Sequence, residues 1–108
     1  MPDHSALDTI ILAAVADRAR YGYELTERIA ELTDGRVTVR PGNLYRVLHR
    51  LAERGLVTER AGAGAGEDER RRYFQATAAG RRFAAAELAM YARVLTRAPA
   101  IKELLSNS

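Results

Sequence analysis

The residues best suited to chemistry lie on one side of the segment VRPGNLYRVLHRLAERGLVTER, residues 39–60. A helix that begins at Pro41 turns about 100° per residue and gathers an apolar stripe of Leu44, Val47, Leu48 and Leu51. The opposite face then carries Gly42, Asn43, Arg46, His49, Arg50 and Glu53, with Tyr45 on its flank. Arginine is the commonest specific partner of guanine, and cationic side chains neutralise phosphates. The segment therefore predicts recognition of a nucleic acid, with the division between base and phosphate contacts left open.

Further candidate contacts lie outside this helix face. Tyr21 and Tyr23 stand at the start of the preceding helix, where phosphate binding is favoured, although Tyr23 equally suits core or interface packing. Tyr45 suits either the DNA backbone or packing on that same helix start. The predicted DNA contacts are Tyr21, Tyr23, Arg40, Gly42, Asn43, Tyr45, Arg46, His49, Arg50, Arg70, Arg71 and Arg72.

Arg70, Arg71 and Arg72 begin the second strand of a predicted hairpin. They either clamp phosphates or pair with the acidic residues 67–69 beside them. Because successive side chains of a strand point to opposite faces, not all three arginines can contact DNA.

The charge distribution supports the same interpretation. Residues 36–82 hold 11 arginines against 5 acidic residues, a net charge of +6, whereas residues 1–35 carry −4 and residues 83–108 carry +1. A basic middle between flanks of lower charge suits an anion-binding surface, and the alternative is a solvated face without a partner.

Other functions find no support in the residues. The chain has no cysteine, and its two histidines, His4 and His49, are far apart in the sequence, so no metal, cofactor or catalytic group is predicted. The repeat AGAGAG at residues 61–66 lies between two predicted strands and opens no helix, unlike a phosphate-binding loop. No signal peptide or membrane span is evident, so we expect a cytoplasmic protein. Because the residues offer no catalytic set, we also expect that it is not an enzyme.

The elements that hold these residues follow from periodicity and from helix start and stop signals. Helices are expected to begin near Ser5, Gly22, Pro41 and Thr77 and to end near Ala16, Gly35, Gly55 and Pro99, and strands are expected at residues 36–39, 56–60 and 70–75. Residues 5–8 resemble a capping box, and residues 101–105 either add one more turn or fray. This order predicts a mainly α fold with a small β wing: a winged helix-turn-helix at residues 1–76 and a long C-terminal dimerisation helix at residues 77–108.

Four motifs resemble the PadR-like family of transcriptional regulators. They are YGYEL at residues 21–25, PGNLY at 41–45, LHRLAERGL at 48–56, and RRYFQAT at 71–77 followed by Gly80. The resemblance implies a bacterial DNA-binding repressor of the short-tailed branch, dimeric through its C-terminal helix. Some relatives in that branch release DNA when a planar aromatic molecule binds at the dimer interface. This chain departs from the family at Ala76, where leucine is usual, and at the acidic wing tip, which would repel phosphates.

The last helix carries an apolar stripe about 160° wide, more than one small core requires, so we expect it to pack against a second copy. The predicted dimer contacts are Leu7, Ile11, Phe83, Leu88, Met90, Tyr91, Val94 and Leu95. Glu87 lies inside the stripe. It either forms an interface ion pair or joins Phe83, Met90 and Tyr91 in a pocket for a small planar aromatic effector.

The sequence and the resemblance together predict a homodimeric repressor of transcription that binds double-stranded operator DNA, and they leave release by a small aromatic effector open. One alternative is a winged-helix module for protein–protein contact, which predicts a neutral face on the third helix. Another is an effector-binding adaptor with weak DNA affinity, for which Glu53 and the acidic wing tip leave room.

Overall fold

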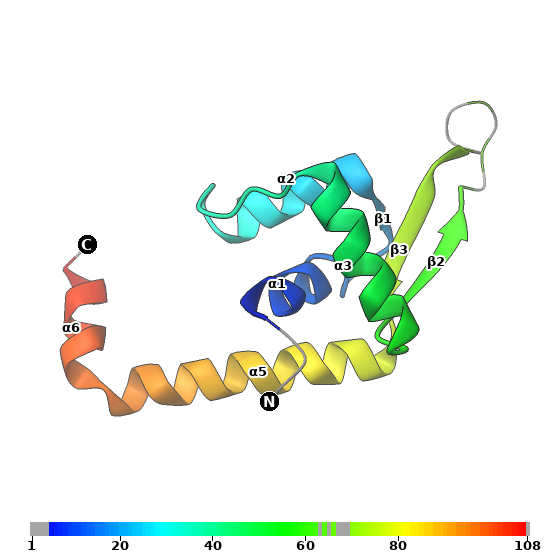
Figure 1. Ribbon diagram of the computed structural model, residues 1–108. Coiled ribbons are helices and arrows are strands. Elements are labelled where there is room, and N and C mark those ends of the chain that lie inside the picture. The colour runs from blue at the N-terminus through cyan, green and yellow to red at the C-terminus, as the bar shows by residue number, and fades with distance from the viewer. Residues whose placement is uncertain (1–4, 63, 65, 67–69, 108) are drawn as a thin grey trace.

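The computed structural model describes residues 5–62, 64, 66 and 70–107, which form a helical domain with a three-stranded antiparallel sheet and a long C-terminal arm (Figure 1). In chain order the elements are α1 (Ala6–Ala14), β1 (Arg20–Tyr21), α2 (Gly22–Leu32), α3 (Pro41–Glu53), β2 (Val57–Ala61), β3 (Arg72–Ala76), α5 (Ala78–Arg97) and α6 (Pro99–Ser106). This mainly α arrangement with a small β wing confirms the predicted winged helix-turn-helix.

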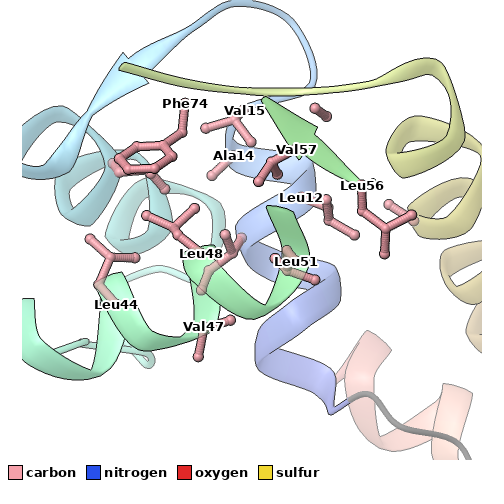
Figure 2. Packing of buried hydrophobic residues seen from close by; sticks show 14 of the residues in the cluster. Leu12, Ala14, Val15, Leu44, Val47, Leu48, Leu51, Leu56, Val57 and Phe74 are labelled. Carbon is pink, nitrogen blue, oxygen red and sulfur yellow. The ribbon is translucent and has the colours of Figure 1, made fainter. Parts of the chain in front are cut away.

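The core forms where the apolar faces of α1, α2 and α3 meet the sheet. The predicted stripe of α3 is buried against β2, β3 and α1 (Figure 2); its members are Leu44, Val47, Leu48 and Leu51. Burying each such side chain contributes about 1.5–3 kcal/mol. One face of α3 is therefore fixed in the core, and its other face is left to solvent.

The ends of α2 and α3 follow the predicted glycine and proline signals. Gly35 has a φ of 74°, and its N–H donates to the Ala30 carbonyl at 2.8 Å. Gly55 has a φ of 73°, and the N–H of Leu56 donates back into α3 at 2.9 Å. Positive φ favours glycine, which explains both helix stops. Pro41 occupies the first turn of α3, where its missing N–H removes no helical hydrogen bond.

Two predicted details of α1 are wrong. Ser5 forms no capping box, because its Oγ donates to Asp8 Oδ1 at 3.2 Å instead of accepting from the helix backbone. The helix also ends at Ala14 rather than at Ala16. Asp8 is one carbon shorter than the glutamate that usually closes a capping box, and its carboxylate is fully buried in the protein.

The first strand also differs from the prediction. Residues 36–39 form no strand, whereas Arg20 and Tyr21, expected in a linker, pair with residues 73 and 74 of β3. Arg20 accounts for this, since its Nη1 donates to the Ala14 carbonyl and to Asp17 Oδ1, both at 2.6 Å. These bonds hold β1 at the end of α1, within reach of the wing.

The wing is the antiparallel hairpin of β2 and β3, with a register that runs from residues 57 and 76 to residues 61 and 72. Both strands begin slightly later than predicted. Leu56 lies in the core just after α3, and Arg70 and Arg71 precede β3. The acidic segment 67–69 lies outside the described residues.

The long helix α5 begins against the core and then leaves it. Thr77 Oγ1 accepts from the N–H of Gly80 at 3.0 Å, which confirms the predicted N-cap. A β-carbon on Gly80 would lie 2.0 Å from the Leu56 carbonyl oxygen, so the helix start is packed closely on the segment that joins α3 to β2. Ala84 is also buried, but residues 88–97 are all exposed. Figure 1 shows α5 extending past α1, with α6 bent away from its axis.

Candidate DNA-binding surface

The outer face of α3 is open to solvent, beside the wing strands (Figure 1). Gly42, Asn43, Arg46 and His49 are exposed, and a β-carbon on Gly42 would meet no atom within 4 Å. His49 Nε2 lies 3.0 Å from Glu53 Oε1, a contact that is an ion pair only when the imidazole is protonated. Within the part of the chain that the structure describes, no hydrogen bond or ion pair engages the Arg46 side chain. Arg46 is therefore a cation available to a partner.

Arg50 differs from Arg46 because it is bound within the protein. Its Nη2 donates to Asp8 Oδ1 at 2.5 Å, and its side chain is 45% exposed while that of Asp8 is 0% exposed. Helical periodicity correctly assigns Arg50 to the polar side of α3. It gives no sign of a partner 42 residues away. Arg50 thus lies at the edge of the basic face, held towards α1.

Tyr23 and Tyr45 lie between the N-terminal ends of α2 and α3. A β-carbon on Gly22 would lie 2.5 Å from the Tyr45 hydroxyl oxygen, and the rings of Tyr45 and Phe74 are 6.0 Å apart. Tyr45 therefore packs on the start of α2, one of its two predicted alternatives, and its 45% exposure leaves DNA contact open as well. Tyr23 is 66% exposed, so core packing is wrong for it. The lining of an apolar hollow of about 260 Å³ at this place consists of Gly22, Tyr23, Thr26, Pro41, Leu44 and Tyr45.

The root of the wing carries a second basic group. The Arg71 guanidinium carbon lies 4.3 Å from the centroid of the Tyr21 ring, which in turn meets the Tyr73 ring edge-on at 5.5 Å. Arg72 Nε lies 3.8 Å from Glu59 Oε1, and Arg70 is exposed. The three arginines therefore have different surroundings, but only Arg72 belongs to β3, so strand alternation does not account for the difference. Their predicted alternative partners, residues 67–69, lie outside the described residues.

The sequence of the winged domain matches a known family. The family model described as the transcriptional regulator PadR-like family covers residues 11–86. The chain belongs to the PadR-like family. As a PadR-like protein it is a DNA-binding transcriptional regulator, and regulators of this family are generally not enzymes.

Individual proteins are also similar to the chain over most of its length. An uncharacterised protein of Lysinibacillus sphaericus is 29% identical over 77 residues, which make up 71% of this PadR-like chain and 70% of that protein. The PadR-like transcription factor of Bacteroides fragilis matches with a TM-score of 0.70 and 21% identity over 88% of each chain. Bacillus subtilis PadR, solved in complex with operator DNA, matches with a TM-score of 0.67 and 20% identity over 78% of this chain and 47% of that chain. The two structures support the shared fold.

The structure leaves most of the predicted dimer contacts of this PadR-like chain uncovered. One assignment is wrong: Ile11 is fully buried in its own core, so it cannot meet a second copy. Leu7 and Phe83 are half-buried at the edge of the core. The exposed members are Leu88, Met90, Tyr91, Val94 and Leu95, and α6 adds Ile101, Leu104 and Leu105. Residues 101–105 form part of a helix, one of the two predicted alternatives, and the helical spacing of Ile101, Leu104 and Leu105 places them on one face.

The four predicted effector residues are spread along α5. Phe83 is half-buried, with the Arg54 guanidinium carbon 5.3 Å from its ring centroid, and Glu87 is also half-buried. Met90 and Tyr91 are exposed. A hollow of about 370 Å³ further along the helix is lined by Met90, Arg93, Val94, Arg97 and Ala98. A single chain thus brings only Met90 of the predicted set to this hollow.

Among the residues that the structure describes, no three His, Cys, Asp or Glu side chains gather in a way that would hold a metal ion. Across the same residues, no helix is both long and apolar enough to cross a membrane.

Proposed function

We propose that the chain is a homodimeric repressor that binds operator DNA with the outer face of α3 and the root of the wing. One observation carries this proposal. The apolar stripe of α3 is buried in the core, and its opposite face leaves Arg46 and His49 exposed beside Gly42 and Asn43. A helix held in this way enters the major groove in winged-helix proteins. The Bacillus subtilis relative, solved with operator DNA, supports the choice of partner.

The net charge of +6 on residues 36–82 supports DNA over a protein partner, because a module for protein contact has no need of a cationic face. Arg71 and the exposed Arg70 extend this charge to the wing root. Arg40 is exposed immediately before α3 and adds a further cation. In this proposal residues 1–76 bind DNA and residues 77–108 form the dimerisation arm.

The test of this proposal measures the affinity for a duplex taken from the promoter of the protein's own gene. Arg46→Ala should weaken binding by about 1–3 kcal/mol if Arg46 contacts a base edge. Arg82→Ala removes the same charge from an exposed position on α5 and serves as the matched control. Equal losses in the two variants would contradict a specific role for α3, provided that circular dichroism gives the same helix content for both.

We also propose that a small planar aromatic molecule binds between two copies, near Phe83, Glu87, Met90 and Tyr91. Met90 and Tyr91 are 40% and 48% exposed beside the half-buried Glu87, and exposed aromatic and methionine side chains favour stacking with a flat ligand. A fluorescence screen of cationic and neutral planar dyes tests this. Glu87→Gln should weaken only the cationic dyes, and a wild-type protein that binds no dye would contradict the pocket.

A further inference from the structure

We propose that Asp8 is a positioning residue that directs Arg50 towards base recognition. The inference rests on the proposed function, since it assumes that α3 binds DNA. It assigns a role in specificity to a residue of α1 that has no exposed surface of its own: Asp8 is 0% exposed, whereas the Arg50 side chain is 45% exposed. Asp8 therefore acts only through the arginine that it holds.

The contact between the two residues occupies one side of the guanidinium. Asp8 Oδ1 accepts from Arg50 Nη2 at 2.5 Å and from Ser5 Oγ at 3.2 Å. Asp8 Oδ2 is buried without a hydrogen-bond partner among the described residues. Because a guanidinium has several N–H donors in a planar fork, the donors that face away from Asp8 remain available at the edge of the basic face.

Stability alone does not account for a carboxylate at this place. A buried carboxylate loses its hydration. Arg50 offsets that loss only in part, because the second carboxylate oxygen, Oδ2, has no hydrogen-bond partner among the described residues. An apolar side chain would suit a position on α1 that is 0% exposed better. What Asp8 adds, and an apolar residue would not, is a fixed orientation for Arg50.

A fixed guanidinium meets DNA differently from a free one. A free arginine adapts to whichever phosphate is near and loses side-chain entropy when it binds, whereas the Arg50 guanidinium is already hydrogen-bonded to Asp8. The negative charge of Asp8 also weakens the attraction of Arg50 for distant phosphates. Both effects favour a directed contact with a base edge over contact with the backbone.

The experiment compares two duplexes of equal length and base composition: one selected by the wild-type protein from a randomised pool, the other a scrambled version of it. Asp8→Asn preserves the side-chain shape and removes the charge. We expect the ratio of the two affinities to fall roughly 5- to 30-fold in Asp8→Asn, because only the selected duplex is bound more weakly. In an Arg50→Ala background the same change should have no further effect on the ratio. In an Arg46→Ala background its full effect should remain, since Arg46 makes no contact with Asp8.

The inference would be overturned if Asp8→Asn lost the same affinity for both duplexes. Additive effects of Asp8→Asn and Arg50→Ala on the affinity ratio would also overturn it. A wild-type protein that binds no duplex in a salt-dependent way would instead overturn the proposed function. If Asp8→Asn does not fold, an NMR measurement on the wild-type protein tests the inference instead. NMR spectra of nitrogen-labelled arginine side chains should show slow rotation of the Arg50 guanidinium in free protein and fast rotation for Arg46. Fast rotation in both would contradict the role of Asp8.

Discussion

The almost entirely buried side chain of Arg20 connects β1 to the end of α1 and to Asp17 in the turn between them. Its Nη1 donates to the Ala14 carbonyl at the end of α1, and its two Nη atoms reach the Asp17 carboxylate at 2.6 and 3.3 Å. Since β1 begins at Arg20, these bonds fix the turn between α1 and the sheet. A cation buried in this way depends on an ionised partner.

Asp17→Asn should therefore destabilise the protein at neutral pH but not in strong acid. The hydrogen bond from Arg20 lowers the pKa of the Asp17 carboxyl from its ordinary value of 3.8 to about 2. A carboxyl whose pKa is lower in the folded state stabilises the fold above its unfolded pKa, and that contribution is lost as the pH falls from about 4 towards about 2. The side chain is 59% exposed, so screening limits the effect to about 1 kcal/mol or less.

Chemical unfolding of the wild type and Asp17→Asn over this pH range measures the difference between them. Glu27→Gln, an exposed substitution on α2, is the control for a general loss of negative charge. A destabilisation by Asp17→Asn that persists below the folded pKa would contradict the ion pair as its cause.

Gly80→Ala should be among the most damaging single methyl additions in the described chain. Its β-carbon would lie 2.0 Å from the backbone oxygen of Leu56, which cannot move without displacing the end of α3. We expect a loss of about 3 kcal/mol in the free energy of unfolding. Gly42→Ala, where the β-carbon meets no atom within 4 Å, should instead be neutral or stabilising by up to roughly 1 kcal/mol. Urea unfolding without DNA compares the two, and similar values would contradict the close contact.

At the scale of the elements, local patterns suffice for the helices but not for the contacts between distant segments. The start and end of α3 follow from Pro41, its apolar spacing and Gly55. In contrast, β1 has only two residues, and its pairing with β3 depends on the turn that Arg20 fixes. Neither helical nor strand periodicity in the sequence predicts that turn.

The same limit applies to the site. Periodicity places Arg50 on the polar side of α3, but its bond to Asp8 arises only when α1 and α3 pack together. An apolar stripe fits a core and an interface equally well, so helical spacing alone does not show that Ile11 is fully buried in its own core. Sequence patterns therefore predict faces, and packing decides what each face meets.

The wing root gives a prediction for the ring of Tyr21. Because this ring supports the Arg71 guanidinium at 4.3 Å, Tyr21→Ala should release Arg71 and weaken duplex binding by about 0.5–1 kcal/mol. Tyr21→Phe keeps the ring and should bind almost as the wild type does. Fluorescence anisotropy with a labelled duplex measures both affinities. A loss in Tyr21→Phe as large as that in Tyr21→Ala would mean that the hydroxyl group contacts DNA and that the stack is secondary.

At the scale of the whole molecule, the main feature is the uncovered apolar surface of α5 and α6. The molecule measures 52 × 28 × 22 Å, and its C-terminal arm exposes Leu88, Met90, Tyr91, Val94, Leu95, Ile101, Leu104 and Leu105. An apolar surface of this kind on a small protein usually marks an interface. The proposed dimer covers it and also joins two DNA-binding domains.

Val94→Glu should convert the proposed dimer into a monomer without unfolding the winged domain. Val94 is 58% exposed, so a charge there does not disturb the core of the winged domain. It should disrupt only an interface in which Val94 packs against another molecule. Ala89→Glu places the same charge on the opposite side of α5, about 240° from Phe83 at 100° per residue, and should leave assembly unchanged. Sedimentation velocity at micromolar concentration distinguishes the two. A wild-type protein that sediments as a monomer would contradict the dimer.

The central claim, that the basic face of α3 binds DNA, is tested most directly by the salt dependence of duplex binding. If Arg46, the wing root and their neighbours neutralise phosphates, the logarithm of the association constant should fall linearly with the logarithm of salt concentration, with a slope of about −0.9 for each phosphate neutralised. A titration of the wild-type protein against a labelled promoter duplex gives this slope. We expect it to be steep and to be accompanied by the loss of affinity in Arg46→Ala. Binding that is weak and independent of salt, and unchanged in Arg46→Ala, would contradict the account and favour a winged-helix domain that contacts proteins.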